Sequence, residues 1–344
     1  MAGVVNRRII LKSRPSGIPQ PDDFELVEVP RQDLGPGELL IRNIYLSVDP
    51  AQKGWVSAAA NYSQPVGLGE VMRAFTVGEV VASNHQGYSV GEIVCGMLGW
   101  QEYALSDGKG IEHRVDPLPA PISTALGVLG HTGLTAYFAL LDIGQPRSGE
   151  TVVVSTAAGA VGSVVGQIAK IKGCRTVGLT GSDTKVGFCL NEFGYDAALN
   201  YKTTADLDSA LEEACADGVN VFFDNTGGAI SDAVLRHISV GARIVICGTA
   251  ATASWDPPPL GPRVDRRLLV NRARMQGFLL FDYRDRYSEG LTQMTEWVRQ
   301  GRIKYREDIV DGLQNAPAAL ASLYEGKNKG KLLIRLGSEP EATA

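Results

Sequence analysis

The segment that most constrains the fold of this chain is the apolar run Thr151–Ser155, which continues directly into the sequence TAAGAVG at 156–162. Apolar residues at helical spacing follow, so the segment predicts a strand, a tight turn and a helix. Aligned to the pattern G-x-G-x-x-G, it places Ala157, Gly159 and Gly162 at the three glycine positions. In this context the pattern predicts a dinucleotide-binding turn, because Gly159 lets the backbone approach a pyrophosphate and Gly162 lets helix and strand pack closely. An ordinary tight strand-to-helix turn is the alternative interpretation.

From about residue 123 onward, strand-like and helical stretches alternate, which is typical of an α/β domain. Near-continuous apolar strands such as VVVS and RIVIC suit a parallel sheet covered on both faces. The predicted strands occupy 151–155, 175–179, 197–200, 219–224, 242–247 and 275–281, and the predicted helices between them occupy 161–172, 185–193, 207–215 and 230–238. We therefore expect a doubly wound parallel sheet of the Rossmann type.

The first part of the chain has a different texture. From residue 4 to about residue 122, short β-type runs such as 38–46, 76–81 and 92–97 are separated by glycine and proline. A small, mostly β domain is expected there, so the 344 residues should form two globular domains. The apolar run KLLIRL, at 331–336, predicts a further strand near the end of the chain.

Composition limits the partners of the chain. The formal net charge is −5 and the basic residues are scattered, so a nucleic-acid partner is not expected. The apolar tetrapeptide near the amino terminus is shorter than a secretory or membrane-spanning segment, which predicts a cytoplasmic protein without a membrane partner. The five cysteines are far apart and form no C-x-x-C pair, so neither a disulfide framework nor a structural zinc site is indicated.

The end of the second predicted strand bears on the choice of dinucleotide. An NAD-binding domain typically carries an acidic residue there to bind the ribose hydroxyls. This chain reads Gly181-Ser182 at that place, its first acid is Asp183, and Lys185 follows. A missing carboxylate and a nearby cation suit the 2′-phosphate of NADP, which favours NADPH over NADH. For Lys185 alone, a solvated lysine near a helix terminus is the alternative.

A β-rich first half followed by a Rossmann half resembles the medium-chain dehydrogenase/reductase superfamily. The zinc branch of that superfamily needs cysteine and histidine ligands, and the four histidines here lie in no Gly-His-Glu context, so no metal is predicted. The chain is more similar to the zinc-independent branch of prostaglandin reductases, plant alkenal double-bond reductases and bacterial curcumin reductases. The resemblance covers nearly the whole chain and rests on SVDP (47–50), GEVM (69–72), GLTAY (133–137), AAGAVGS (157–163), VGQIAKIKGC (165–174), GSDTK (181–185), FDNTGG (223–228), DGLQNAPAAL (311–320) and GKNKGK (326–331).

The resemblance implies a domain arrangement and an oligomer. The C-terminal segment of such proteins folds back into the first domain. This implies a GroES-like, substrate-binding domain made of 1–122 and 312–344, and a Rossmann NADPH-binding domain at 123–311. Most relatives are homodimers joined through the last strand of the Rossmann sheet, here MQGFLLF at 275–281. The expected substrate is a small enone or enal.

The resemblance also places the coenzyme contacts. The pyrophosphate turn falls on Gly159, Ala160, Val161 and Gly162, and the region of the 2′-phosphate falls on Gly181, Ser182, Lys185 and Tyr201. Further positions along the coenzyme are Asn225, Cys247, Gly248, Thr249, Phe278, Leu279, Leu280 and Asn328.

The chemistry that the resemblance implies is reduction of an activated carbon–carbon double bond, with hydride going to the β-carbon and a proton to the α-carbon. Negative charge develops on the carbonyl oxygen and calls for a hydrogen-bond donor. Tyr62 aligns with a tyrosine of the curcumin-reductase-like relatives and is the first catalytic candidate, with a packing role as the alternative. His131 is the second candidate, with a purely structural place at a helix start as the alternative.

Several positions depart from the pattern of the relatives. Ala253 stands where many of them carry a tyrosine, and Ala51, Lys53 and Trp55 change the residues that follow SVDP. The proton donor therefore stays open. So do quinone reduction or alcohol oxidation on the same scaffold, and a non-catalytic NADPH-binding role.

Overall fold

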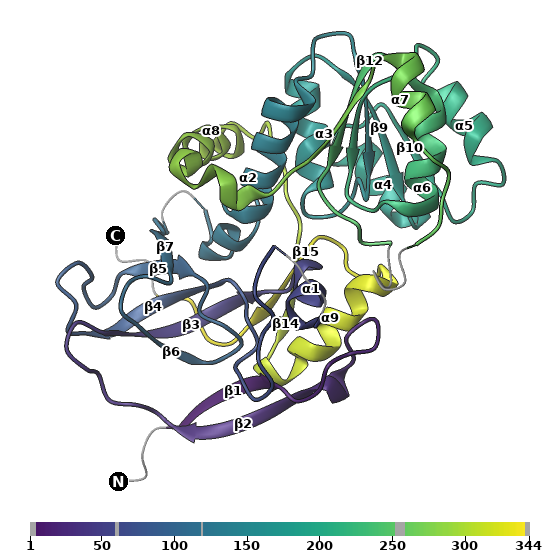
Figure 1. Cartoon of the computed structure of the whole chain (residues 1–344). Helices are drawn as coiled ribbons and strands as arrows, with labels where there is room; N and C mark the ends of the chain where they lie inside the picture. Colours follow the sequence, from purple (N-terminus) through teal and green to yellow (C-terminus); the bar gives the residue numbers. More distant parts are fainter. Residues whose placement is uncertain (1–4, 59–61, 118–119, 252–258, 341–344) are drawn as a thin grey trace. The chain divides into compact units, whose positions relative to one another are not determined.

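The computed structural model describes residues 5–58, 62–117, 120–251 and 259–340, and the chain divides into two compact units. Unit 1 comprises Met1–Leu126 and Glu307–Ala344, and unit 2 comprises Gly127–Arg306 (Figure 1). The boundaries expected from the sequence, at 122 and 312, lie a few residues away from these. Both units follow the expected architecture, with a mostly β unit and a parallel-sheet unit.

Unit 2 is built on a six-stranded sheet in the order β10-β9-β8-β11-β12-β13, in which every neighbouring pair is parallel. Counted along the chain this order is 3-2-1-4-5-6, which is that of the Rossmann fold. The strands are β8 (Thr151–Ser155), β9 (Arg175–Thr180), β10 (Ala197–Asn200), β11 (Val219–Asp224), β12 (Ile238–Ile246) and β13 (Arg274–Gly277). The order of connection reverses between β8 and β11, and ligands of such sheets bind beyond the carboxyl ends of the strands at that point.

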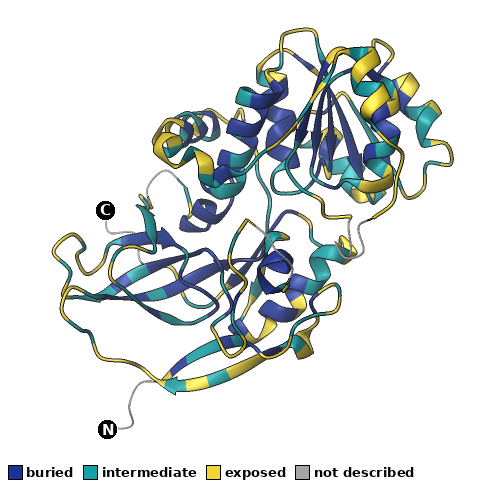
Figure 2. Ribbon diagram, viewed as in Figure 1, coloured by how far each residue is buried: buried dark blue, intermediate teal, exposed yellow. Residues whose placement is uncertain are grey.

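Helices cover both faces of this sheet because successive side chains of its strands point to opposite sides. Val154 and Phe223 pack into one buried cluster with residues of α3, whereas Val153 and Phe222 pack into another with α5 and α6. Figure 2 shows the strands buried and the outer helix faces exposed. The helices of unit 2 are α2 (His131–Phe138), α3 (Gly162–Ile171), α4 (Asp183–Asn191), α5 (Leu207–Ala214), α6 (Gly228–Val234), α7 (Asp265–Asn271) and α8 (Tyr287–Arg299).

The last strand of this sheet is shorter than the sequence predicts. We expected it to run through 275–281, but β13 ends at Gly277 and a 3-10 helix, η5, occupies Leu280–Arg286. Of the apolar residues 278–281, Leu280 is buried, whereas Phe278, Leu279 and Phe281 are partly exposed. Leu280 joins a cluster with Phe138 of α2, and the rings of Phe278 and Tyr283 lie 5.1 Å apart.

Unit 1 contains a seven-stranded sheet in the order β14-β15-β3-β4-β5-β7, with β6 paired to β3, and a separate two-stranded ribbon, β1-β2. The bounds are β1 (Val5–Leu11), β2 (Phe24–Pro30), β3 (Leu39–Ser47), β4 (Thr76–Ser83), β5 (Ile93–Gly96), β6 (Tyr103–Ser106), β7 (Ile111–Arg114), β14 (Glu307–Asp311) and β15 (Lys331–Arg335). The α-helices among the described residues of this unit are α1 (Ala51–Val56) and α9 (Ala316–Glu325). Because β15 pairs with β3, the C-terminal segment is part of the same sheet as the first part of the chain.

Candidate functional site

The turn between β8 and α3 is shaped by close contacts to Thr156. The Gly159 amide donates to the Thr156 carbonyl at 2.8 Å, and the Ala157 amide donates to the Leu179 carbonyl of β9 at 3.0 Å. A Cβ atom on Gly162 would lie 2.3 Å from the Thr156 oxygen, and one on Gly159 would lie 2.8 Å from its methyl group. Position 162 therefore needs glycine, and position 159 leaves little room for a side chain. The turn also contains Ala160 and Val161, so its side chains are small and its backbone is accessible at the N-terminus of α3. This arrangement fits the pyrophosphate of a dinucleotide.

The ends of β9 and β10 bring a second group of predicted residues together. Ser182 is the N-cap of α4, and its hydroxyl accepts from the Lys185 amide at 3.3 Å. The Tyr201 amide donates to the Thr180 carbonyl at 3.0 Å. A Cβ atom on Gly181 would lie 2.8 Å from the Tyr201 hydroxyl, so a larger residue at 181 would displace the Tyr201 side chain. Partial burial raises the pKa of the Tyr201 phenol, which keeps it a hydrogen-bond donor at neutral pH.

This second group has no carboxylate at the end of β9, where an NAD-binding domain uses one to bind the ribose hydroxyls. Asp183 is the first acid after β9, and its carboxylate accepts from the Asn200 amide at 2.7 Å. That contact ties the start of α4 to the end of β10. The arrangement suits a 2′-phosphate beside Ser182 and Lys185.

The ends of β11 and β12 position a third group. The Asp224 carbonyl accepts from the amides of Cys247 and Gly248 at 2.8 and 3.1 Å. A Cβ atom on Gly248 would lie 2.8 Å from the Asn225 carbonyl oxygen, so this approach also needs glycine. Burial raises the pKa of the Cys247 thiol to about 12, which keeps the thiol protonated at neutral pH. Thr249 follows as an exposed residue.

His131 and the residues after β13 lie near the start of α2. The His131 ring lies edge-on to the rings of Phe281 and Tyr287, with centroids 6.0 Å away in each case. Phe278 continues the sheet by donating its amide to the Ile246 carbonyl at 3.0 Å, and Leu279 and Leu280 follow it. His131 is thus held by aromatic packing and stays partly exposed.

Two predicted site residues, Tyr62 and Asn328, belong to unit 1. Tyr62 is half exposed, and the pKa of its phenol is raised, chiefly by desolvation. Lys53 of α1 is buried, with its ammonium group 5.7 Å from the centroid of the Tyr324 ring. The Tyr324 hydroxyl donates to the Pro50 carbonyl at 2.8 Å, which ties α9 to the start of α1. The Asn328 amide donates to the Gly330 carbonyl at 2.8 Å and shapes the turn before β15.

Ala253, together with its neighbours at 252 and 254, lies outside the described residues. Sequence reasoning also missed a contributor, Asp224, which is 1% exposed and organises the ends of three strands. An aspartate that closes the apolar run VNVFFD was the available signal, because a carboxylate beside a buried strand needs several donors.

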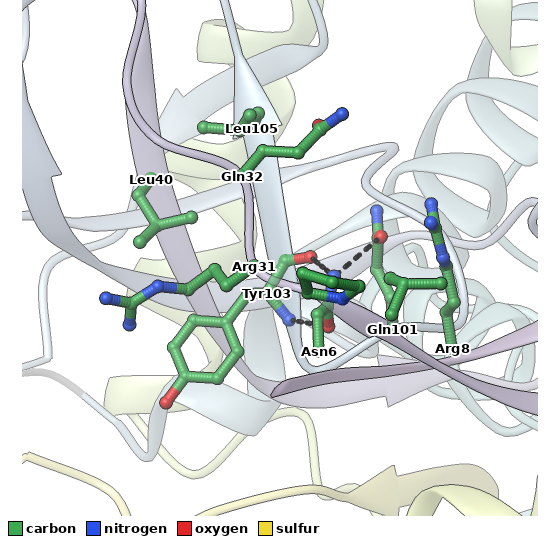
Figure 3. A pocket seen from close by; sticks show the side chains of 10 residues that line it. Asn6, Arg8, Arg31, Gln32, Leu40, Gln101, Tyr103 and Leu105 are labelled. Atoms are coloured by element: carbon green, nitrogen blue, oxygen red, sulfur yellow. Dashed lines mark hydrogen bonds between the residues drawn. The ribbon is translucent and has the colours of Figure 1, made fainter. Parts of the chain in front are cut away.

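Unit 1 also has a shallow hollow, which is lined by residues other than those predicted for the coenzyme and the substrate. The Asn6 amide there donates to the Tyr103 carbonyl at 2.8 Å, and the Arg31 guanidinium lies over the Tyr103 ring (Figure 3). None of the predicted site residues lines this hollow. The Asn6 amide also lies 3.5 Å from the Gln101 side-chain oxygen.

Within 5–58, 62–117, 120–251 and 259–340, no three His, Cys, Asp or Glu side chains gather into a group that could hold a metal ion. Over the same ranges, no helix has the length and apolar character needed to cross a membrane.

Comparison with known proteins places the chain. The family model described as the N-terminal domain of oxidoreductase matches residues 7–113, and the one described as zinc-binding dehydrogenase matches residues 160–297. The NADPH-dependent curcumin reductase of Escherichia coli is 43% identical, with 97% of this chain and 98% of that protein covered. Prostaglandin reductase 1 of Sus scrofa is 40% identical, with 94% and 97% covered. The solved structure of CurA in complex with NADPH from Vibrio vulnificus matches with a TM-score of 0.90 at 44% identity, covering 97% of this chain and 100% of that one.

The fold and these relatives define the chain as a two-domain, NADP-dependent oxidoreductase. It belongs to the medium-chain dehydrogenase/reductase family, in the branch that contains the prostaglandin, alkenal and curcumin reductases. The expected family, fold class and coenzyme are thereby confirmed.

Proposed function

We propose that the protein reduces the activated carbon–carbon double bond of α,β-unsaturated ketones and aldehydes with NADPH. The observation that carries the proposal is the coenzyme site at the carboxyl ends of the Rossmann strands. It consists of the Gly159–Gly162 turn and the group at Gly181, Ser182, Lys185 and Tyr201. Relatives named as curcumin and 2-alkenal reductases support the double bond as the acceptor.

The coenzyme fits the residues that would hold it. The bare turn at Gly159 and Gly162 would hold the pyrophosphate, and Ser182, Lys185 and Tyr201 would hold the 2′-phosphate. NADPH would supply a hydride for the β-carbon. The chain itself must then stabilise the enolate oxygen and let a proton reach the α-carbon.

Tyr62 is the residue we assign to the oxygen. Its phenol, whose pKa desolvation raises above the ordinary value of 10.0, is protonated at neutral pH and can donate a hydrogen bond to that oxygen. We assign His131 a smaller role, in orienting the acceptor, because its ring is already packed edge-on against Phe281 and Tyr287.

The test is NADPH consumption with a panel of enals, aryl enones and quinones, together with NADPH formation from NADP+ and a panel of alcohols. We expect turnover of the enals and enones, a loss of about tenfold or more in kcat for Tyr62→Phe, and a smaller loss for His131→Ala. Tyr103→Phe, which alters a tyrosine of the same unit outside the proposed site, is the matched control. Turnover of quinones or alcohols alone would replace the proposed acceptor. Tight NADPH binding without turnover of any acceptor would indicate a non-catalytic protein.

The second proposal concerns assembly, where we infer a homodimer formed edge to edge at β13. This strand ends the six-stranded sheet and pairs only with β12 among the described residues. In α7, which directly precedes β13 in the chain, Leu269 and Val270 are 76% and 52% exposed, although both are aliphatic. A second copy of this chain would satisfy both features. Light scattering should give a dimer, and Leu269→Asp with Val270→Asp should give a monomer; a monomeric wild type would contradict the proposal.

The expected cytoplasmic location also remains a proposal. All five cysteines are free thiols, which suits a reducing compartment. Fractionation of cells that produce the protein is the test, and recovery outside the cytoplasm would overturn it.

A further inference from the structure

The carboxylate of Asp224, at the end of β11, is the most heavily bonded side chain near the coenzyme edge. One oxygen accepts from the Ser155 hydroxyl at 2.9 Å, from the Thr226 amide and hydroxyl at 2.9 and 3.1 Å, and from the Gly227 amide at 3.0 Å. The other oxygen accepts from the Ser231 hydroxyl at 2.6 Å. These five hydrogen bonds compensate the burial of a carboxylate.

The same residue joins three strand ends. Its carboxylate reaches Ser155 at the end of β8, and its backbone carbonyl accepts from Cys247 and Gly248 just after β12. These three ends lie where the strand order reverses between β8 and β11, which is where ligands of doubly wound sheets bind. No lysine or arginine among the described residues forms an ion pair with Asp224. The donors that surround it therefore carry the whole compensation.

Ser155 connects this carboxylate to Asn225. Its hydroxyl donates to Asp224 and accepts from the Asn225 backbone amide at 2.8 Å, so both of its hydrogen-bonding roles are fixed. The Asn225 side-chain amide nitrogen donates to the Ser155 carbonyl at 2.7 Å. Since a carbonyl only accepts, the nitrogen of the side chain must face Ser155. The Asn225 Oδ1 atom then points the other way, as an acceptor with no donor among the described residues.

We propose that Asp224 is a positioning residue: through the Ser155 hydroxyl it fixes the backbone of Asn225, whose side-chain oxygen, turned outward by the bond to the Ser155 carbonyl, is thereby held ready to accept a hydrogen bond from a hydroxyl or amide donor of NADPH. The proposal rests on the coenzyme contact assigned to Asn225. It adds that the orientation of Asn225 depends on a buried carboxylate which does not itself touch the coenzyme.

Ser155 and Ser231 provide a matched pair of variants. Each donates one hydroxyl bond to the same carboxylate, but only Ser155 also contacts Asn225. We expect Ser155→Ala and Ser231→Ala to lower Tm by similar amounts. Ser155→Ala should raise the Kd for NADPH about three- to tenfold, as expected for loss of one hydrogen bond, and Ser231→Ala should leave it within about twofold. In Ser155→Ala, KM for NADPH should rise while kcat changes little, because the loss affects binding and not the reacting atoms.

Two further variants separate failure of this proposal from failure of the coenzyme contact itself. Asn225→Ala should raise the Kd by about tenfold, and Asp224→Asn should raise it because a neutral acceptor holds Ser155 less firmly. An unchanged Kd in Asn225→Ala would defeat the coenzyme contact. A raised Kd in Asn225→Ala together with equal Kd values in Ser155→Ala and Ser231→Ala would overturn the role of Asp224 alone.

Discussion

The ammonium group of Lys331 lies 2.5 Å from the Asp49 carboxylate and also donates to the Val48 carbonyl at 3.2 Å. The contact joins β15 to the segment just before α1, and the Lys331 side chain is only 5% exposed. The C-terminal strand is therefore fixed to unit 1 by a buried ion pair as well as by its pairing with β3.

The first prediction concerns this pair. Lys331→Met should lower the free energy of unfolding by about 3 kcal/mol, because it leaves the Asp49 carboxylate without its cation in a largely buried place. Urea unfolding measures the effect. Lys327→Met removes an exposed partner of Glu325 and should change stability by less than about 0.5 kcal/mol. Equal effects of the two substitutions would show that the buried pair contributes nothing special.

The second prediction concerns Thr156, whose φ of +54° is a left-handed conformation that a β-branched residue rarely adopts. Thr156→Gly should raise the free energy of unfolding by about 1 kcal/mol, since relief of strain exceeds the entropy that glycine adds to the unfolded chain. Thr156→Ala keeps a Cβ atom and is the matched control, with no gain expected. A loss of stability in Thr156→Gly would argue against strain at this turn.

Much of unit 2 could be predicted from the sequence, because its strands are buried runs that end abruptly. The predicted bounds of β8, β10 and β11 match the structure residue for residue. The prediction for β13 was wrong at its end, since an apolar run such as 278–281 suits either a strand or packing against a helix. Packing against α2 makes this run a 3-10 helix and not a strand. No local sequence pattern shows where α2 will lie, so the end of β13 could not be predicted.

The residues of the candidate site also fall into those that the sequence could predict and those that it could not. Gly159 and Gly162 could be found from the motif, because a tight strand-to-helix turn demands small residues at fixed spacing, and Gly181 could be found only from the resemblance to the family. The bonds between Asp224 and Ser155 could not be found, since the two residues are 69 positions apart and meet only when β8 and β11 pair.

The third prediction concerns Glu307 of β14. Burial raises the pKa of its carboxyl above the usual 4.5, although the Ser123 hydroxyl donates to one oxygen at 2.7 Å. The folded state thus binds this proton more tightly than the unfolded state. The stability contributed by the protonated carboxyl is present below about pH 4.5 and is lost as pH rises through the folded pKa.

Glu307→Gln should abolish this loss of stability at high pH, because glutamine does not ionise. The variant should have a higher Tm than the wild type at about pH 8 and a similar Tm at about pH 4, as a series of thermal melts will show. Glu25→Gln, at an exposed position, is the control and should follow the wild type throughout. A constant difference across the pH range would mean that the effect does not come from titration of Glu307.

The last prediction tests the choice of coenzyme at Lys185. A lysine ammonium beside a phosphate acts as a point charge, and a hydrogen bond to a charged group contributes about 1.5–3 kcal/mol. Lys185→Ala should therefore lower kcat/KM for NADPH by about tenfold or more and leave the value for NADH almost unchanged, because NADH has no 2′-phosphate. Lys172→Ala is the control, because it removes an exposed lysine at the C-terminal end of α3 and so changes the net charge by the same amount without touching the predicted phosphate contact. Lys185→Glu should go further and favour NADH, since a carboxylate repels the phosphate and can accept from the ribose hydroxyls in its place. If Lys185→Ala weakened both coenzymes equally, the lysine would serve the start of α4 and the preference for NADPH would have to come from Ser182 and Tyr201.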